Sequence, residues 1–260
     1  MAEAINQRIE GTDIYVFSRG DEESYTFFRP FELDEAKQLA DATNRLIADY
    51  DVKGLNGRGL EVDEGRTEIF NISTLRGILA NRTLMQQTDG QSWFPTIGEG
   101  VKLQRAGLYR DGILIDHGLA LYSEENPDAE IAASLVADAQ RLSLALPALV
   151  SFNSLDLEQG GTRYGITPKL VSKKGVISGK EAERVLGESF RWVGNSGVLG
   201  LGRYGGGWGA SWGGVLGSFG TGCRVGRFIA VGDAQKLQEE ALGSFSPIKR
   251  SLDNLLSSVQ

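Results

Sequence analysis

The stretch Val101–Leu121, VKLQRAGLYRDGILIDHGLAL, carries the strongest local signal of secondary structure in the chain. Asp111 and Gly112 stand between two apolar runs, Val101–Leu108 and Ile113–Leu121. Both central residues of a two-residue hairpin turn need positive φ, which the pair Asp-Gly adopts readily. The stretch therefore predicts two antiparallel strands joined by a tight turn.

Outward from this hairpin, strand and helix signals follow one another without regular βαβ order. Further strands are expected at Asp13–Phe17, Tyr25–Phe28, Leu149–Phe152 and Val225–Val231. Helices are expected after the cap residues Asp34, Ser73, Asp128, Ser178, Asp233 and Ser246. Residues 52–66 are predicted as a loop and residues 88–100 as irregular. The order predicts an α+β fold with a mixed or antiparallel sheet, hairpins and peripheral helices.

The composition excludes several chemistries. The chain has 260 residues, with 35 glycines, one cysteine and one histidine. Cys223 alone cannot close an internal disulfide, and with His117 alone it cannot build a Cys/His zinc site. The N-terminus holds acids and no apolar run, so no secretory signal is predicted and a cytoplasmic or intracellular location is expected.

Glycine is concentrated late in the chain, where 14 glycines fall between Gly194 and Gly226. The surrounding residues 189–232 contain no acid and four arginines. Since the formal net charge is −7, the rest of the chain carries −11. The expected organisation is an α+β body over 1–188, a long glycine-rich insert over 189–232, and C-terminal helices over 233–260 that pack on the body. All three parts are expected to form one domain.

The leading hypothesis is a non-enzymatic structural protein that forms a homo-oligomer, as a component of a virion, shell or filament. Glycine lets backbones approach closely, and tryptophan supplies contact area at interfaces. The glycine-rich segment is therefore expected at the contacts between subunits. Its aromatic residues and arginines are the expected contact residues: Trp192, Arg203, Tyr204, Trp208, Trp212, Phe219 and Arg224.

Other interpretations of the same segment stay open. Gly200–Gly205 fits G-x-G-x-x-G, but a phosphate loop needs a following helix and an acid about 20 residues on, and no acid appears before Asp233. Gly217–Thr221 resembles the Gly-Ser turn of nucleotidyltransferases, but the positions that follow lack their paired carboxylates, so this interpretation is rejected. The uncharged stretch 204–223 favours conditional membrane insertion and pore formation as the runner-up, without a transmembrane helix because glycine abounds. Nucleic acid or an anionic membrane surface could be bound through Arg191, Arg203, Arg224 and Arg227.

No catalytic, cofactor or metal site is predicted. His117 has no evident nucleophile partner, and Cys223 is expected to be a small buried residue. Glu61, Asp63 and Glu64 could bind a hard cation, but their spacing fits no EF-hand and a solvated loop is expected. A small basic patch is also expected to be solvated: Lys173, Lys174 and Lys180. An enzyme for a nucleotide or small molecule, with an unrecognised site, is a further alternative.

Overall fold

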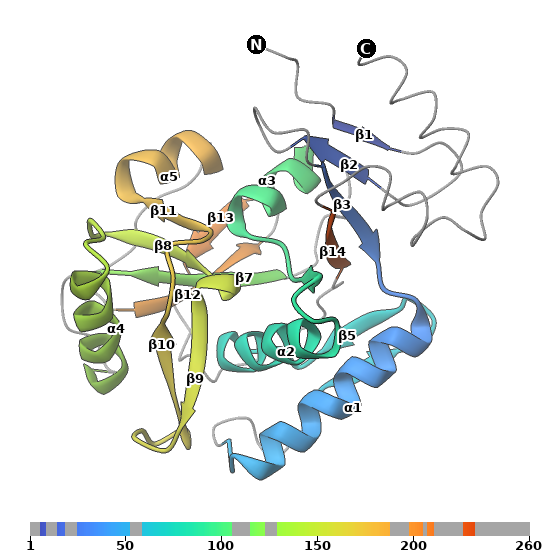
Figure 1. Cartoon of the computed structure of the whole chain (residues 1–260), viewed down its shortest axis with the longest axis horizontal. Coiled ribbons are helices and arrows are strands. Elements are labelled where there is room, and N and C mark those ends of the chain that lie inside the picture. The colour runs from blue at the N-terminus through green and yellow to red at the C-terminus, as the bar shows by residue number, and fades with distance from the viewer. Residues whose placement is uncertain are drawn as a thin grey trace.

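The computed structural model describes residues 6–8, 15–18, 25–52, 59–105, 115–122, 129–187, 198–204, 207–210 and 226–231. These residues form five α-helices, two five-stranded sheets and two two-stranded sheets (Figure 1). Every strand pair among them is antiparallel. The predicted α+β class with antiparallel sheet is confirmed.

One five-stranded sheet has the strand order β11-β8-β7-β12-β13. Its members are β11 (Val176–Ser178), β8 (Ala148–Ser151), β7 (Ile115–Leu121), β12 (Val198–Tyr204) and β13 (Gly207–Ala210). Successive side chains of a strand point to opposite faces. Accordingly, Leu119 and Leu121 of β7 belong to the larger hydrophobic cluster, and Ala120 belongs to the smaller one. This sheet therefore separates two hydrophobic cores.

The other five-stranded sheet joins early and late parts of the chain in the order β1-β2-β3-β14-β6. It consists of β1 (Asn6–Arg8), β2 (Tyr15–Ser18), β3 (Tyr25–Pro30), β14 (Gly226–Val231) and β6 (Ser92–Trp93). The pairing of β2 with β3 confirms the predicted first hairpin, and β14 confirms the predicted late strand.

The helices are α1 (Leu33–Asp49), α2 (Thr74–Gln87), α3 (Ile97–Arg105), α4 (Ala129–Arg141) and α5 (Gly179–Leu186). Helix α2 packs against α1, β7 and β9, and its residues Leu75, Ile78 and Leu79 are fully buried. Its predicted cap is confirmed, because the Ser73 side chain accepts the Arg76 N–H. Helix α1 instead begins at a capping box in which Glu32 is the N-cap and Glu35 the third residue.

Two hairpins complete the described fold. One joins β4 (Glu61–Asp63) to β5 (Glu68–Phe70), and the other joins β9 (Leu155–Gln159) to β10 (Ile166–Leu170). A short 3-10 helix, η1 (Phe152–Ser154), connects β8 to β9. The prediction of a loop over 52–66 is therefore wrong at β4.

The prediction of a strand over Val101–Leu108 is also wrong, because residues up to Arg105 lie in α3. Thr96 and Glu99 start this helix with a reciprocal capping box: Glu99 Oε2 accepts the Thr96 N–H at 2.8 Å, and Thr96 Oγ1 accepts the Glu99 N–H at 3.3 Å. The prediction of an irregular stretch over 88–100 is wrong at residues 92–93, which form β6, and at residues 97–100, which begin α3. The second predicted strand of that hairpin is present as β7, while Asp111-Gly112 lies outside the described residues.

Candidate functional site

The glycine-rich segment supplies β12 and β13, which pair with each other at one end of their sheet. In the register of this pair, Arg203 lies opposite Trp208 and Tyr204 lies opposite Gly207. Three of the predicted contact residues are therefore in two adjacent strands, and the structure brings the backbone of Arg203 beside that of Trp208. Sequence reasoning grouped these residues by composition but did not predict that they share a hairpin.

The remaining predicted contact residues lie outside the described part of the chain: Trp192, Trp212, Phe219 and Arg224, together with Arg191. Cys223 and the helices expected after Asp233 and Ser246 lie outside it as well. Arg227 is in β14, where it is registered opposite Arg29 of β3. Arg227 thus belongs to a different sheet from Arg203.

Strand β12 is attached to the core through β7. Val198 is registered with Leu121, and Gly200 is registered with Leu119. Both leucines are almost completely buried, at 1% and 0% exposure. The described glycine-rich strands are therefore continuous with the packed sheet, because β12 hydrogen-bonds directly to a core strand.

A β-bulge interrupts the β12–β7 ladder. Leu201 pairs with Gly118, but the next residue pairs with Asp116, so His117 is skipped. Gly118 has a φ of 145°, and a β-carbon there would lie 2.0 Å from the Val150 carbonyl oxygen. Only glycine fits such a position, so the sequence Asp-His-Gly fixes the bulge. The single histidine of the chain thus occupies the irregular position of β7.

Strand β13 has one strand neighbour, β12, among the described residues. A strand at the end of a sheet presents unpaired N–H and C=O groups along its outer side. Residues 207–210 are Gly-Trp-Gly-Ala and include neither proline nor a charged residue, the residue types that commonly block an exposed sheet edge. The arrangement is chemically suited to accept another strand.

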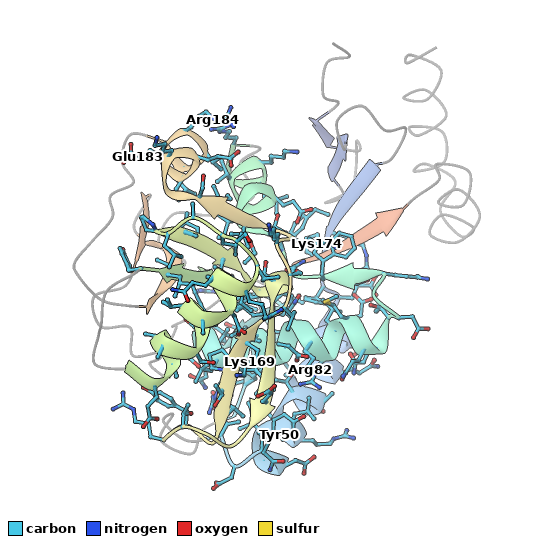
Figure 2. All side chains as sticks on the ribbon, turned by 60° about the vertical axis from the view of Figure 1, so that its left-hand side comes forward. Tyr50, Arg82, Lys169, Lys174, Glu183 and Arg184 are labelled. Atoms are coloured by element: carbon cyan, nitrogen blue, oxygen red, sulfur yellow. The ribbon has the colours of Figure 1, made fainter. Side chains whose placement is uncertain are left out.

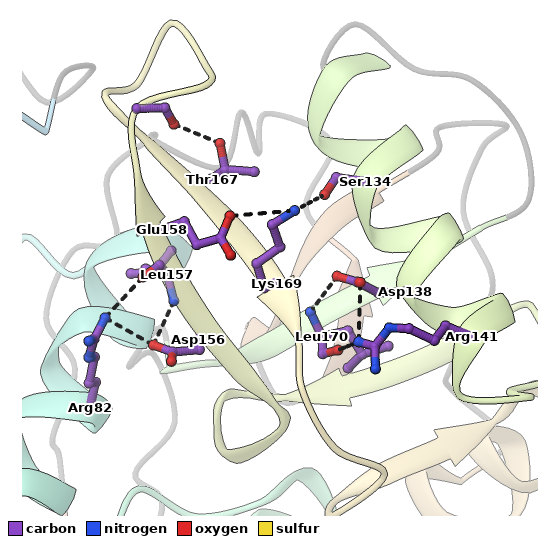
Figure 3. A network of polar contacts seen from close by, with 11 residues as sticks. Arg82, Ser134, Asp138, Arg141, Asp156, Leu157, Glu158, Thr167, Lys169 and Leu170 are labelled. Carbon is purple, nitrogen blue, oxygen red and sulfur yellow. Dashed lines mark hydrogen bonds and ion pairs between the residues drawn. The ribbon is translucent and has the colours of Figure 1, made fainter.

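The β9–β10 hairpin provides a contrast, because helix side chains bind its outer backbone (Figure 3). On β10, Asp138 Oδ2 accepts the Leu170 N–H at 3.0 Å, and Arg141 Nη2 donates to the Leu170 carbonyl at 3.0 Å. On β9, Arg82 Nη1 donates to the Leu157 carbonyl at 3.0 Å. These three side chains occupy the positions that another strand would bind. The hairpin edges are thereby closed at Leu157 and Leu170.

The acidic trio expected in a solvated loop lies instead on the β4–β5 hairpin. Glu61 and Asp63 are in β4, and Glu64 in the following turn binds Lys37 of α1 at 2.6 Å. Asp63 accepts the Gly65 N–H at 2.8 Å, which is ordinary turn geometry. Over the described residues no group of three or more His, Cys, Asp or Glu is arranged to hold a metal ion.

Two buried polar residues were not singled out by the sequence. Arg76 is 1% exposed; it donates from Nη1 to the Asn71 carbonyl at 3.2 Å, and its Nε has no hydrogen-bond partner among the described residues. Burial lowers the pKa of Arg76 to about 10. Asn153 of η1 is 9% exposed, and neither side-chain amide atom has a partner in the described part. No sequence signal indicated that Arg76 and Asn153 are buried, because polar residues in such a pattern are usually expected at the surface.

Comparison with known proteins gives no relative from which a function could be carried over. The chain matches no family model, and neither a curated protein nor a solved structure is detectably similar to it. Across the described helices, none combines the length and the apolar character needed to cross a bilayer.

Proposed function

We propose that this protein is a non-enzymatic assembly subunit that forms homo-oligomers through its glycine-rich strands. The observation that carries the proposal is the position of β13 as the last strand of its sheet among the described residues. A second copy would extend that sheet by backbone hydrogen bonding along Gly207–Ala210. A shell, filament or virion component is the class of structure that such contacts build.

Three further features support this proposal. Strand β13 contains neither proline nor a charged residue, so nothing in its sequence blocks pairing with a second backbone. The edges of the β9–β10 hairpin are closed at Leu157 and Leu170 by Arg82, Asp138 and Arg141, so these positions do not compete for strand pairing. The acid-free segment is positively charged and the remainder of the chain is strongly acidic, so the segment of one copy can attract the acidic body of another.

The experiment uses proline substitutions at neighbouring positions of β13. Successive N–H groups of a strand point to opposite sides, so of Gly209 and Ala210 one donates toward β12 and the other points away from it. Proline removes the donor in each case. We expect one of Gly209→Pro and Ala210→Pro to give a folded monomer and the other to lower the stability of the subunit. Gly209→Ala and Ala210→Ser keep the N–H and serve as controls that retain the oligomer.

Light scattering coupled to size-exclusion chromatography measures the outcome, with circular dichroism as the check on folding. A wild-type chain that is monomeric over a wide concentration range would refute the proposal. So would oligomers that survive both proline substitutions. Dye release from anionic vesicles, lost in the same variants, would favour the membrane-inserting alternative instead.

A further inference from the structure

The described surface carries an acidic region on α1 and the β4–β5 hairpin. Its members are Asp34, Asp41, Glu61, Asp63 and Glu64, called here the acidic surface. All of them are exposed except Asp63, which is partly exposed. Helix α1 and β4 are held together by two hydrogen bonds of the Asn44 side chain to the Leu60 backbone, at 3.0 and 2.6 Å. The five carboxylates thus belong to one continuous region.

Charge is poorly balanced within the acidic surface. Lys37 binds Glu64 at 2.6 Å, and the pKa of Lys37 is raised by this hydrogen bond and by the charges of Glu64, Asp34 and Asp41. One lysine therefore lies in the field of three carboxylates. Arg66 is a second cation of this region and lies 4.0 Å from Asp63. Asp34, Asp41 and Glu61 make no ion pair with any residue that the structure describes.

A second region carries the opposite charge. It is formed by α3, α5 and the loop before β11, and its members are Arg105, Lys173, Lys174, Lys180 and Arg184, called here the basic surface. All five are exposed. Arg105 Nη2 donates to the Val185 carbonyl at 3.4 Å and so ties α3 to α5.

The loop of the basic surface is fixed against the start of α3. Lys174 Nζ lies 4.5 Å from the centre of the Trp93 ring, and Trp93 Nε1 donates to Glu99 Oε2 of α3 at 3.3 Å. Lys173 and Lys180 make no ion pair within the described ranges. The same region contains the exposed acids Glu181 and Glu183 of α5, and Glu181 pairs with Arg184 at 3.0 Å. The unbalanced positive charge of the basic surface therefore comes from its three lysines: Lys173, Lys174 and Lys180.

No ion pair joins the two surfaces among the residues that the structure describes. Helix α5 lies at the top of the described fold and α1 along its bottom (Figure 1). After a turn about the vertical axis, Arg184 of α5 is still at the top and Tyr50, at the C-terminal end of α1, is still at the bottom (Figure 2). Screening limits attraction between exposed charges to about 10 Å at 0.1 M salt, so surfaces that do not pair within one molecule can attract each other when two molecules meet.

We infer that copies of this chain associate head to tail, with the basic surface of one molecule against the acidic surface of the next. This inference rests on the proposed self-assembly and adds a second contact to it. A contact between two different surfaces is heterologous, so it builds a ring when the rotation closes and a filament when it does not. The partner is a second copy, because its acidic surface provides the carboxylates that the lysines lack.

The test uses two charge-reversed variants that are mixed. The first carries Lys173→Glu and Lys180→Glu, and the second carries Asp41→Lys and Glu61→Lys. Each variant alone presents like charges at the contact and should weaken self-association at least about tenfold. An equimolar mixture should restore association, because the reversed surface of one variant complements the reversed surface of the other. Ala133→Lys with Gln140→Lys, on the exposed side of α4, controls for charge change alone.

Sedimentation velocity at two salt concentrations distinguishes the outcomes, with circular dichroism to confirm that each variant is folded. Restoration in the mixture, weakened by added salt, supports the head-to-tail contact. Unchanged association of both single variants would overturn it, and so would loss of association that mixing does not restore. Salt-sensitive binding of the basic surface to a polyanion, without any effect on self-association, would overturn it as well. If the β13 proline substitutions leave self-association unchanged while mixing the two charge-reversed variants restores it, strand pairing is refuted and the head-to-tail contact is not. The two proposals can therefore fail separately.

Discussion

Gly77 of α2 lies against the ring of Phe152 so closely that a β-carbon at position 77 would be 2.5 Å from Phe152 Cζ. Phe152 is 1% exposed and also contacts Phe94 edge to face, with ring centroids 6.4 Å apart. The central helix and the 3-10 turn after β8 therefore meet through a position without a side chain. A core packed at this density has no room into which the ring can move.

Gly77→Ala should consequently lower the free energy of unfolding by about 1–3 kcal/mol, although alanine is the better helix former. Gly98 of α3 is the matched control, because a β-carbon there would meet nothing within 4 Å. Gly98→Ala should raise stability by about 0.5 kcal/mol through the entropy of the unfolded chain. Urea unfolding of both variants measures the difference. Stabilisation by Gly77→Ala would contradict the packing described here.

Gly118 gives a second prediction, for the bulge that connects β7 to β12. Gly118→Ala combines a strained φ of 145° with a contact of 2.0 Å to the Val150 carbonyl oxygen. The backbone oxygen cannot rotate away as a side chain could, so we expect a loss above about 4 kcal/mol or failure to fold. Gly160→Ala is the control, since its φ of 82° is also positive but a β-carbon would meet nothing within 4 Å. The yield of folded protein and the temperature of thermal unfolding are measured for Gly118→Ala and Gly160→Ala. If both variants lose the same stability, the positive φ accounts for the whole loss and the contact with the Val150 carbonyl oxygen contributes nothing.

The sequence predicted the parts of this fold whose signals are local. Ser73 begins α2 because a serine hydroxyl can bind the free N–H groups of a first turn, and that chemistry needs no tertiary contact. The prediction of a strand over Val101–Leu108 was wrong because alternate apolar residues fit a strand as well as a short buried helix. The choice between helix and strand here depends on the burial of Ile97, Val101 and Leu103, and that burial depends on the residues packed around them. The pattern Thr96-x-x-Glu99 was the available signal for a helix.

The amino-acid composition indicated where in the chain the candidate site lies, but it did not predict how the strands of the site pair. Glycine, arginine and tryptophan counts indicated residues 189–232, yet they predict neither that β12 lies beside the core strand β7 nor that Arg203 lies opposite Trp208. The ends of a sheet are a property of its topology, and topology is set by contacts between distant segments. No pattern within β10 shows that Asp138 and Arg141 of α4 close its edge.

Arg76 and Arg82, both on α2, should respond oppositely to replacement by methionine. Arg76 is buried without a carboxylate partner among the described residues, and burial lowers its pKa to about 10. Arg76→Met removes that unpaired charge and should raise the free energy of unfolding by about 1–3 kcal/mol at pH 7. Arg82 pairs with Asp156 at 3.0 Å and binds the Leu157 carbonyl, so Arg82→Met should cost about 1 kcal/mol.

The pH dependence of the Arg76 effect has a fixed sign. The folded pKa of about 10 lies below the usual value of an arginine side chain, so in the pH window between these two values the unfolded chain binds more protons. The wild type therefore gains stability relative to Arg76→Met as the pH rises through this window. Urea unfolding of both proteins at pH 7 and above pH 10 should show the advantage of methionine shrinking. An advantage that grows with pH would contradict a penalty for the buried charge.

Asp138 should protect the outer edge of β10 from pairing with other chains. Its carboxylate is 16% exposed, accepts the Leu170 N–H and also pairs with Arg141 at 3.2 Å. Asp138→Ala leaves Leu170 without its acceptor and Arg141 without its counter-charge, so we expect a loss of about 1–3 kcal/mol. Because the exposed backbone then resembles an open sheet edge, we also expect slow aggregation. Urea unfolding and light scattering over time measure the two effects.

Glu158→Ala is the control for Asp138→Ala, since Glu158 is 70% exposed and lies 3.6 Å from Lys169. Such an exposed pair contributes less than about 1 kcal/mol, so stability should hardly change and no aggregation should follow. Combining Asp138→Ala with the β13 proline that yields a monomer separates the two edges. Aggregation through β10 should persist in the combined variant, because it does not use β13. If that proline suppresses aggregation as well, the Leu170 edge is not the surface that Asp138 protects.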